Sequence, residues 1–200
     1  SLKLVYNGHV GIDPGAGGCY MDRYLLAASD TVYFRVWGWF TGVGGTGSFQ
    51  ADSTTTKMIQ FGGSGYPNFW WLMLFGGEAM SMGVTGAPPA GGATSIYAAI
   101  PLTMNQWVCL EGQITMNTPG VSNGIVRSWV NNVQSINATN LLLRPATQID
   151  ASHGPNANIN RTQFYTQNGR GVIYYDDYAV SRDARIGCGS LPPPPPPPPV

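Results

Sequence analysis

The stretch that decides the fold is Trp107–Asn132, WVCLEGQITMNTPGVSNGIVRSWVNN. Its first part alternates, with polar Gln113 and Thr115 on one side and apolar Ile114 on the other. This is the period of a β-strand with one solvated face and one dry face. Two clusters rich in turn residues interrupt the pattern, and the alternation then resumes. The stretch therefore predicts a long antiparallel hairpin, followed by a third short strand at 133–136.

Segments of similar character lie on both sides of this hairpin. The other predicted strands cover residues 2–6, 31–40, 56–61, 68–75, 78–84, 95–100 and 172–181. Residues 25–28 fit either a short helix or an edge strand, and residues 140–144 predict one helical turn that Pro145 ends. Short strands, Gly-rich turns and the lack of a long helical pattern predict an all-β fold, an antiparallel β-sandwich or jelly roll.

The composition is that of a globular chain with few charges. Hydrophobic residues make up 43% of the 200 residues, and charged residues make up 10%, against about 25% in an average domain. Ten basic side chains balance ten acidic ones, so no positive field favours a nucleic-acid partner. No apolar run has the length of a membrane-spanning helix. A neutral surface of small polar residues favours an extracellular setting, self-association or a coat of sugar.

The C-terminal segment differs from the rest of the chain. Eight consecutive prolines predict a polyproline II helix, because proline cannot join the interior of a sheet. These are Pro192, Pro193, Pro194, Pro195, Pro196, Pro197, Pro198 and Pro199. The helix fits either a stiff linker or a rod in an assembly, with O-linked sugars if the prolines are hydroxylated. We expect a sandwich domain at 1–190 and a polyproline segment at 191–200.

Cysteines and glycan acceptor patterns favour export. Three cysteines, Cys19, Cys109 and Cys188, allow one disulfide and one remaining thiol. Asn137 and Asn160 each begin an Asn-x-Thr pattern, the acceptor of N-linked glycans. With the composition, these features predict a secreted or cell-surface protein whose signal peptide has already been removed.

Three segments resemble polysaccharide-lyase-like proteins of the concanavalin A-like jelly-roll superfamily. They are 32–40, 107–131 with its WVCLE and RSWVN elements, and 174–188 with its YYDDYAVS element. The resemblance implies a jelly roll over about residues 32–188. It also implies that Cys109 pairs with Cys188. The superfamily contains lectins, glycan-cleaving enzymes and adhesion modules, so the resemblance leaves the activity open.

A lyase of this type needs a base and a group that neutralises a uronate carboxylate, both on one sheet. Gln113-Ile114-Thr115 resembles the Gln-Ile-His element of alginate lyases, with Thr in place of His. Arg35-Val36-Trp37 lacks the Glu of their Arg-x-Glu element. The weak lyase candidates are Arg35, Gln113, His153, Arg161 and Tyr165.

A hydrolase on this fold would need two carboxylates on one face of a strand. The chain has two glutamates, Glu78 and Glu111, in separate segments. The adjacent Asp176 and Asp177 point to opposite faces of a strand. Hydrolysis is therefore not expected. One of these aspartates could bind Ca²⁺, but a structural role is favoured, and no metal or cofactor is otherwise expected.

Tryptophans supply candidate platforms for sugar rings, namely Trp70, Trp71 and Trp129. The first functional hypothesis is nevertheless an extracellular structural or adhesive module, the repeating subunit of a glycosylated filament or surface assembly. The strand at 2–6 could pair with the sheet edge of a neighbouring copy. The alternative is a carbohydrate-binding module or a polysaccharide lyase acting on uronates.

Overall fold

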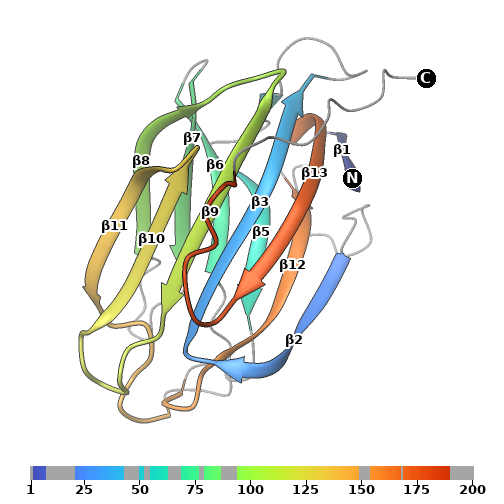
Figure 1. Cartoon of the computed structure of the whole chain (residues 1–200). Coiled ribbons are helices and arrows are strands. Elements are labelled where there is room, and N and C mark those ends of the chain that lie inside the picture. The colour runs from blue at the N-terminus through green and yellow to red at the C-terminus, as the bar shows by residue number, and fades with distance from the viewer. Residues whose placement is uncertain are drawn as a thin grey trace.

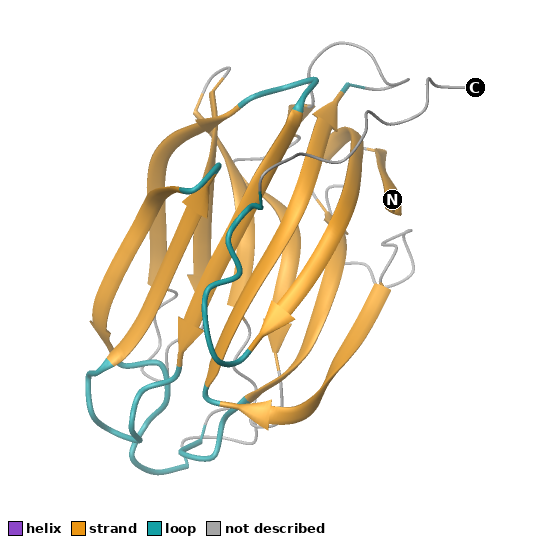
Figure 2. Cartoon of the chain, in the orientation of Figure 1, coloured by secondary structure: helices purple, strands orange, loops and turns teal. Residues whose placement is uncertain are grey.

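A computed structural model describes residues 2–7, 21–42, 50–51, 55–62, 69–76, 79–86, 94–148, 154–167 and 169–189. The regular elements of these ranges are strands, joined by loops and turns (Figure 2). They are β1 (Leu2–Asn7), β2 (Met21–Ser29), β3 (Thr31–Thr41), β4 (Gln50–Ala51), β5 (Thr55–Gly62), β6 (Phe69–Gly76), β7 (Ala79–Gly86), β8 (Thr94–Leu102), β9 (Trp107–Thr115), β10 (Gly124–Val130), β11 (Val133–Leu141), β12 (Ile159–Gln167) and β13 (Gly169–Ser181).

Two antiparallel sheets face each other (Figure 1). The seven-stranded sheet has the order β1-β13-β3-β9-β10-β11, with β4 also paired to β13. The six-stranded sheet has the order β2-β12-β5-β6-β7-β8. The protein is therefore an all-β jelly-roll sandwich, as the sequence predicted. Within the described ranges, no helix is long and apolar enough to cross a membrane.

The core forms where the inward faces of the two sheets meet. On β3, Val32, Phe34, Val36 and Phe40 are buried, and the residues between them point outward, as alternation requires. The ring of Phe34 lies 5.0 Å from the ring of Phe61 on β5, in the opposite sheet. Burying a side chain of this size contributes about 1.5–3 kcal/mol.

The predicted hairpin at 107–132 is present as β9 and β10, paired from Ile125↔Thr115 to Val130↔Leu110. The third strand is longer than expected and extends to Leu141. The predicted helical turn at 140–144 is absent, because β11 continues into it. Of the two alternatives for 25–28, the strand is the one formed, since these residues belong to β2 at the edge of the six-stranded sheet.

The solvated face expected for β9 is instead covered. Glu111 is 1% exposed and Gln113 is 5% exposed, although both point away from the core. Glu111 is covered by a segment that follows β13, described below, whereas Gln113 hydrogen-bonds Arg127 and Thr115. The strand expected to reach a neighbouring copy, β1, pairs with β13 of its own chain over six residues.

Candidate functional site

Polar side chains occupy matched positions on four neighbouring strands of the seven-stranded sheet. Tyr33 on β3 lies opposite Gln113 on β9, Gln113 opposite Arg127 on β10, and Arg127 opposite Asn137 on β11. Residues directly opposite one another in antiparallel strands share a face, with Cβ atoms about 5 Å apart. Their sequence neighbours are in the core, so this shared face is the outer one. We call these four residues the polar row.

Hydrogen bonds between side chains order the polar row. Arg127 Nε donates to Asn137 Oδ1 at 2.9 Å, and Arg127 Nη1 donates to Gln113 Oε1 at 3.4 Å. Gln113 Nε2 in turn donates to Thr115 Oγ1 at 3.1 Å. The arginine is thus held between two amide oxygens on strands to either side of it, and its position is set by the sheet.

Arg127 differs in its partners from other arginines that the structure describes. Three of them pair with a carboxylate: Arg35 with Asp177 at 2.7 Å, Arg144 with Asp30 at 2.8 Å and Arg185 with Glu111 at 2.5 Å. Among the residues that the structure describes, Arg127 contacts neutral oxygens only. Described residues accept from two of its five N–H donors, so within the described part of the structure three donors and the positive charge are left without a partner.

The polar row also carries a phenol. Tyr33 is half-buried, and no described residue exchanges a hydrogen bond with its hydroxyl. A guanidinium, an amide and a phenol therefore lie in line across the sheet. Such a set can bind a carboxylate at the guanidinium, through two parallel hydrogen bonds, and neutral hydroxyls beside it.

Beside the polar row, residues 182–189 lie against the outer face of the same sheet; we call them the strap. Figure 1 shows the strap leaving β13 and crossing in front of β3 and β9. A disulfide joins Cys188 of the strap to Cys109 of β9, with a Cα–Cα distance of 5.8 Å. This is the pair that the family resemblance implied.

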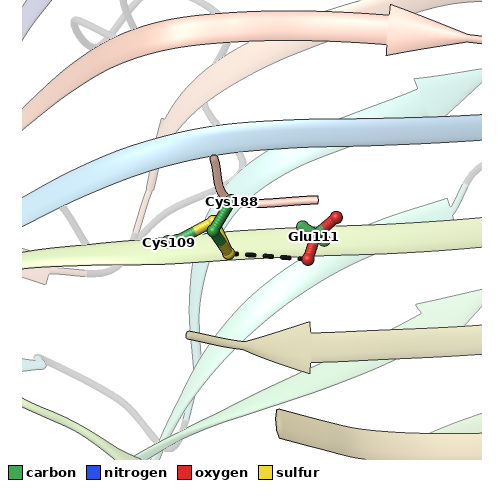
Figure 3. A group of neighbouring side chains, drawn as sticks. All are labelled: Cys109, Glu111 and Cys188. Carbon is green, nitrogen blue, oxygen red and sulfur yellow. Dashed lines mark hydrogen bonds between the residues drawn. A yellow bond between two sulfur atoms is a disulfide. The ribbon is translucent and has the colours of Figure 1, made fainter. Parts of the chain in front are cut away.

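Glu111 binds the strap next to this disulfide (Figure 3). Its carboxylate accepts hydrogen bonds from Gly187 N at 2.7 Å and from the guanidinium of Arg185. The Cys188 sulfur lies 3.5 Å from Glu111 Oε2. That contact is not a donated hydrogen bond, because a disulfide sulfur carries no hydrogen. Glu111 therefore anchors the strap and is closed to a ligand.

The strap also contacts two residues that were candidates from the sequence, one for sugar binding and one for lyase activity. The Arg185 guanidinium carbon lies 4.5 Å from the centre of the Trp129 ring, and Trp129 is 8% exposed. Arg35 donates to Gly187 O at 3.2 Å and pairs with Asp177. Trp129 and Arg35 are therefore parts of the strap's attachment. The polar row lies on the same face, and in it Arg127 is half-buried and Asn137 is exposed.

The five lyase candidates do not meet on one sheet. Gln113 belongs to the polar row, whereas Arg161 and Tyr165 lie on β12 in the six-stranded sheet. Arg161 Nε is buried there, and no described residue bonds to it. His153 lies outside the described residues. Among the described residues, the candidate base Tyr165 is therefore on a strand of the other sheet from Arg35 and Gln113.

The other proposed residues are only partly placed. Trp70 and Trp71 are on β6, but their side chains lie outside the described part of the structure. Asn137 is exposed in the polar row, and Asn160 is half-buried on β12. Cys19 and the prolines at 192–199 lie outside the described residues.

Within the described ranges, one group of side chains could be considered for a metal, namely Cys109, Glu111 and Cys188. Two of these are joined as a disulfide, and the carboxylate is taken by the strap. Ca²⁺ requires six to eight oxygen ligands, so this group does not suit it. Of the two aspartates considered for Ca²⁺, Asp177 pairs with Arg35, and Asp176 accepts a hydrogen bond from the Asp177 backbone N–H.

Two members of the polar row, Tyr33 and Arg127, were not among the sequence-derived candidates. Alternation at 31–40 and 125–131 does predict that both point outward. It does not predict that they lie in one line, because that depends on the register between strands that are distant in sequence.

No known family model and no curated protein matches the chain. Solved structures do resemble it. A variant of the alginate lyase Aly36B bound to an alginate trisaccharide matches with a TM-score of 0.63, 12% identity, and coverage of 91% of this chain and 81% of that one. An endo-β-1,4-glucuronan lyase from the fungus Trichoderma reesei matches with a TM-score of 0.53 and 12% identity, over 89% of this chain and 78% of that one. A pentraxin from Limulus polyphemus matches with a TM-score of 0.54 and 12% identity, over 89% of this chain and 74% of that one. These similarities show that the chain has the concanavalin A-like jelly-roll fold.

Proposed function

We propose that this protein binds an acidic polysaccharide at the polar row. The observation that carries the proposal is the arginine at its centre. Arg127 is held by Asn137 and Gln113, and it has a charge that no described carboxylate neutralises. A repeating uronate supplies one carboxylate per sugar, which matches a fixed guanidinium. Two proteins of similar fold are named for uronate polymers, alginate and glucuronan.

The sheet prepares this site before a ligand arrives. The four residues are on strands, and their positions are fixed by backbone pairing rather than by a loop. A sugar chain lying over the polar row would place one carboxylate at Arg127 and its hydroxyls near Gln113 and Tyr33. Little conformational entropy is lost when such a preformed site binds.

Binding without cleavage is the first form of the proposal. Glu111, which could have acted as an acid or base, and Arg35, which could have neutralised a uronate carboxylate, are both committed to the strap. Thr115 stands where alginate lyases have a histidine, and it hydrogen-bonds Gln113. We further propose a location outside the cell, supported by the Cys109–Cys188 disulfide, because disulfides persist in oxidising compartments.

The test is retardation in gels that contain a polysaccharide. We expect the protein to migrate more slowly in alginate or glucuronan, and to migrate normally in the same polymers after their carboxylates have been reduced to alcohols. The reduced polymers are the matched control, because backbone and linkage are retained while the charge is lost. Equal retardation in both forms, or none in either, would contradict a carboxylate-binding site.

A second candidate function is a uronate lyase. One observation favours it: the Tyr33 phenol lies directly opposite the Gln113 amide, which gives a potential base beside a potential neutraliser. A lyase would release a product with an unsaturated sugar at its end. This product absorbs ultraviolet light, so the absorbance of the reaction mixture would rise with time. Activity that is lost in Tyr33→Phe would establish this candidate. A flat absorbance across several uronate polymers would remove it.

The sequence also favoured a self-associating structural subunit. In the described residues, β1 pairs with β13 of its own chain and is the outermost strand of that sheet, so the fold gives this idea no added support and does not remove it. It remains a proposal, and light scattering of the whole chain at rising concentration tests it. A mass that stays at one protomer would remove it.

A further inference from the structure

We propose that Asn137 is an N-glycosylation site, that Asn160 is not, and that the glycan on Asn137 blocks the polar row. The last part rests on the proposed function, whereas the first two parts do not. Both asparagines begin an Asn-x-Thr pattern, at 137–139 and 160–162. The folded structure treats the two patterns very differently.

The first pattern lies on a strand with an open side. Asn137 and Thr139 are exposed on β11, the edge strand of the seven-stranded sheet, and Ala138 between them packs against the core. A sugar at Asn137 would project from the outer face of the sheet, the face that carries the polar row, close to the sheet edge. It would also shield the unpaired backbone groups of an edge strand from other chains.

The side-chain amide of Asn137 has the orientation that an attached glycan requires. Arg127 can only donate hydrogen bonds, so the Asn137 atom facing it is the oxygen, Oδ1. Nδ2, the atom that takes the sugar, therefore points away from Arg127. Among the described residues, Nδ2 has no hydrogen-bond partner. Glycosylation would keep the Arg127–Asn137 bond, because the amide carbonyl is unchanged.

The second pattern is built into the sandwich. Asn160 is half-buried on β12, which lies between β2 and β5, where the pairing with β2 is irregular. Thr162 is 1% exposed, and its hydroxyl hydrogen-bonds the Tyr178 hydroxyl at 2.6 Å. A chain that folds before transfer hides this acceptor, and a bulky glycan at Asn160 would have to lie over neighbouring strands.

The modification takes its sugar from a lipid-linked diphosphate oligosaccharide. Asn137 Nδ2 forms a bond to the first anomeric carbon, and the bond from that carbon to the diphosphate oxygen breaks. The lipid diphosphate leaves with the electron pair, and Nδ2 loses one proton. This transfer takes place in the same secretory compartment that forms disulfides, in keeping with the Cys109–Cys188 pair.

The glycan would be attached one strand away from Arg127. Although Nδ2 points away from the guanidinium, an oligosaccharide is much larger than the spacing of about 5 Å between paired residues, so it would reach back over the polar row. It would occupy the space that a uronate chain needs in order to bring a carboxylate to the guanidinium. The unmodified protein would therefore bind acidic polysaccharide, and the glycosylated protein would bind it weakly.

The test uses the full chain secreted from a eukaryotic host. Peptide mass spectrometry after glycan removal in heavy-oxygen water marks each occupied asparagine. We expect the mark on Asn137 and not on Asn160. On a gel, Asn160→Gln should migrate with the glycosylated unaltered chain, and Thr139→Ala should migrate as the chain without the glycan. An unmarked Asn137, or a marked Asn160, in the folded protein would overturn the site assignment.

Affinity for uronate oligosaccharides is then compared between the glycosylated protein and two bare forms. These are Thr139→Ala, which keeps every residue of the polar row, and the unaltered chain made in a bacterial periplasm. We expect the bare forms to bind about tenfold more tightly or better. Equal affinity would overturn the blocking role. If no form binds any acidic polymer, the proposed function fails, while the assignment of the glycan to Asn137 still stands on the mass spectra.

Discussion

Glu111 is a carboxylate with 1% of its surface exposed, and it depends on the strap for its partners. Arg185 and the Gly187 backbone supply them, and Arg185 itself is one-third exposed, at 33%. Removing the arginine would leave a buried charge with one backbone donor. We therefore expect Arg185→Ala to lower the free energy of unfolding by about 2–3 kcal/mol.

The measurement is the melting temperature of Arg185→Ala, compared with that of Arg182→Ala and of the unaltered chain. Arg182 is exposed in the same strap, so its loss should change the melting temperature very little. If the two variants melt together, Glu111 does not depend on Arg185 for its stability in the fold.

Asn117 shows how one amide can organise a loop. It is fully buried, its oxygen accepts from the backbone N–H groups of Leu143 and Arg144, and its nitrogen donates to Thr118 O and Arg144 O. Asn117→Ala would leave buried backbone groups unpaired. We expect a loss of about 3 kcal/mol, seen as a lower midpoint in urea. The exposed Asn123→Ala is the control and should cost less; an equal cost for both would contradict this role of Asn117.

Such residue-level roles were beyond prediction from sequence. Alternation along β3 puts Tyr33 and Arg35 on the face opposite the buried Phe34. It also predicts a solvated face for the strand that carries Gln113, but Gln113 is 5% exposed. On the same face, Glu111 is buried beneath the strap, a segment about 75 residues later in the chain. The pattern along one strand carries no information on what a distant segment will lay over it.

At the scale of elements, the strap is the feature that shapes the outer face. The Cys109–Cys188 disulfide closes a loop with a sequence separation of 79 residues. Closing a loop of that length stabilises the fold by about 4 kcal/mol in the chain-entropy account. We expect reduction to lower the melting temperature, as measured by calorimetry with and without a reductant.

The double variant Cys109→Ala, Cys188→Ala is the matched control for that experiment. It should melt at a lower temperature than the unaltered chain and should not respond to the reductant. An unaltered chain whose melting temperature stays constant, while thiol titration shows the bond to be reduced, would mean that the strap is held by Glu111 and Arg35 alone.

The elements themselves were largely predictable, and their partners were not. The hairpin of β9 and β10 follows from alternation and turn residues in one continuous stretch. The helical turn expected at 140–144 failed because local propensity lost to pairing of β11 with β10. The polar row requires the pairing of β3 with β9, which are separated by five strands in sequence, so only the folded structure reveals it.

At the scale of the molecule, the outer face of the seven-stranded sheet has two parts with different roles. The strap closes the part around Glu111 and Trp129, and the polar row leaves a fixed cation at its border. The fold shared with alginate and glucuronan lyases is compatible with this use but does not establish it, since the identity is 12%. The claim therefore stands or falls on Arg127.

The measurement that tests this claim most directly is a calorimetric titration of a uronate tetrasaccharide into three bare proteins: the unaltered chain, Arg127→Ala and Arg182→Ala. Loss of a charged hydrogen-bond donor costs about 1.5–3 kcal/mol, so Arg127→Ala should bind at least about tenfold more weakly. Arg182→Ala removes the same charge from the strap and should bind like the unaltered chain. Equal weakening in both variants would show only a general effect of charge, and full affinity in Arg127→Ala would contradict the site.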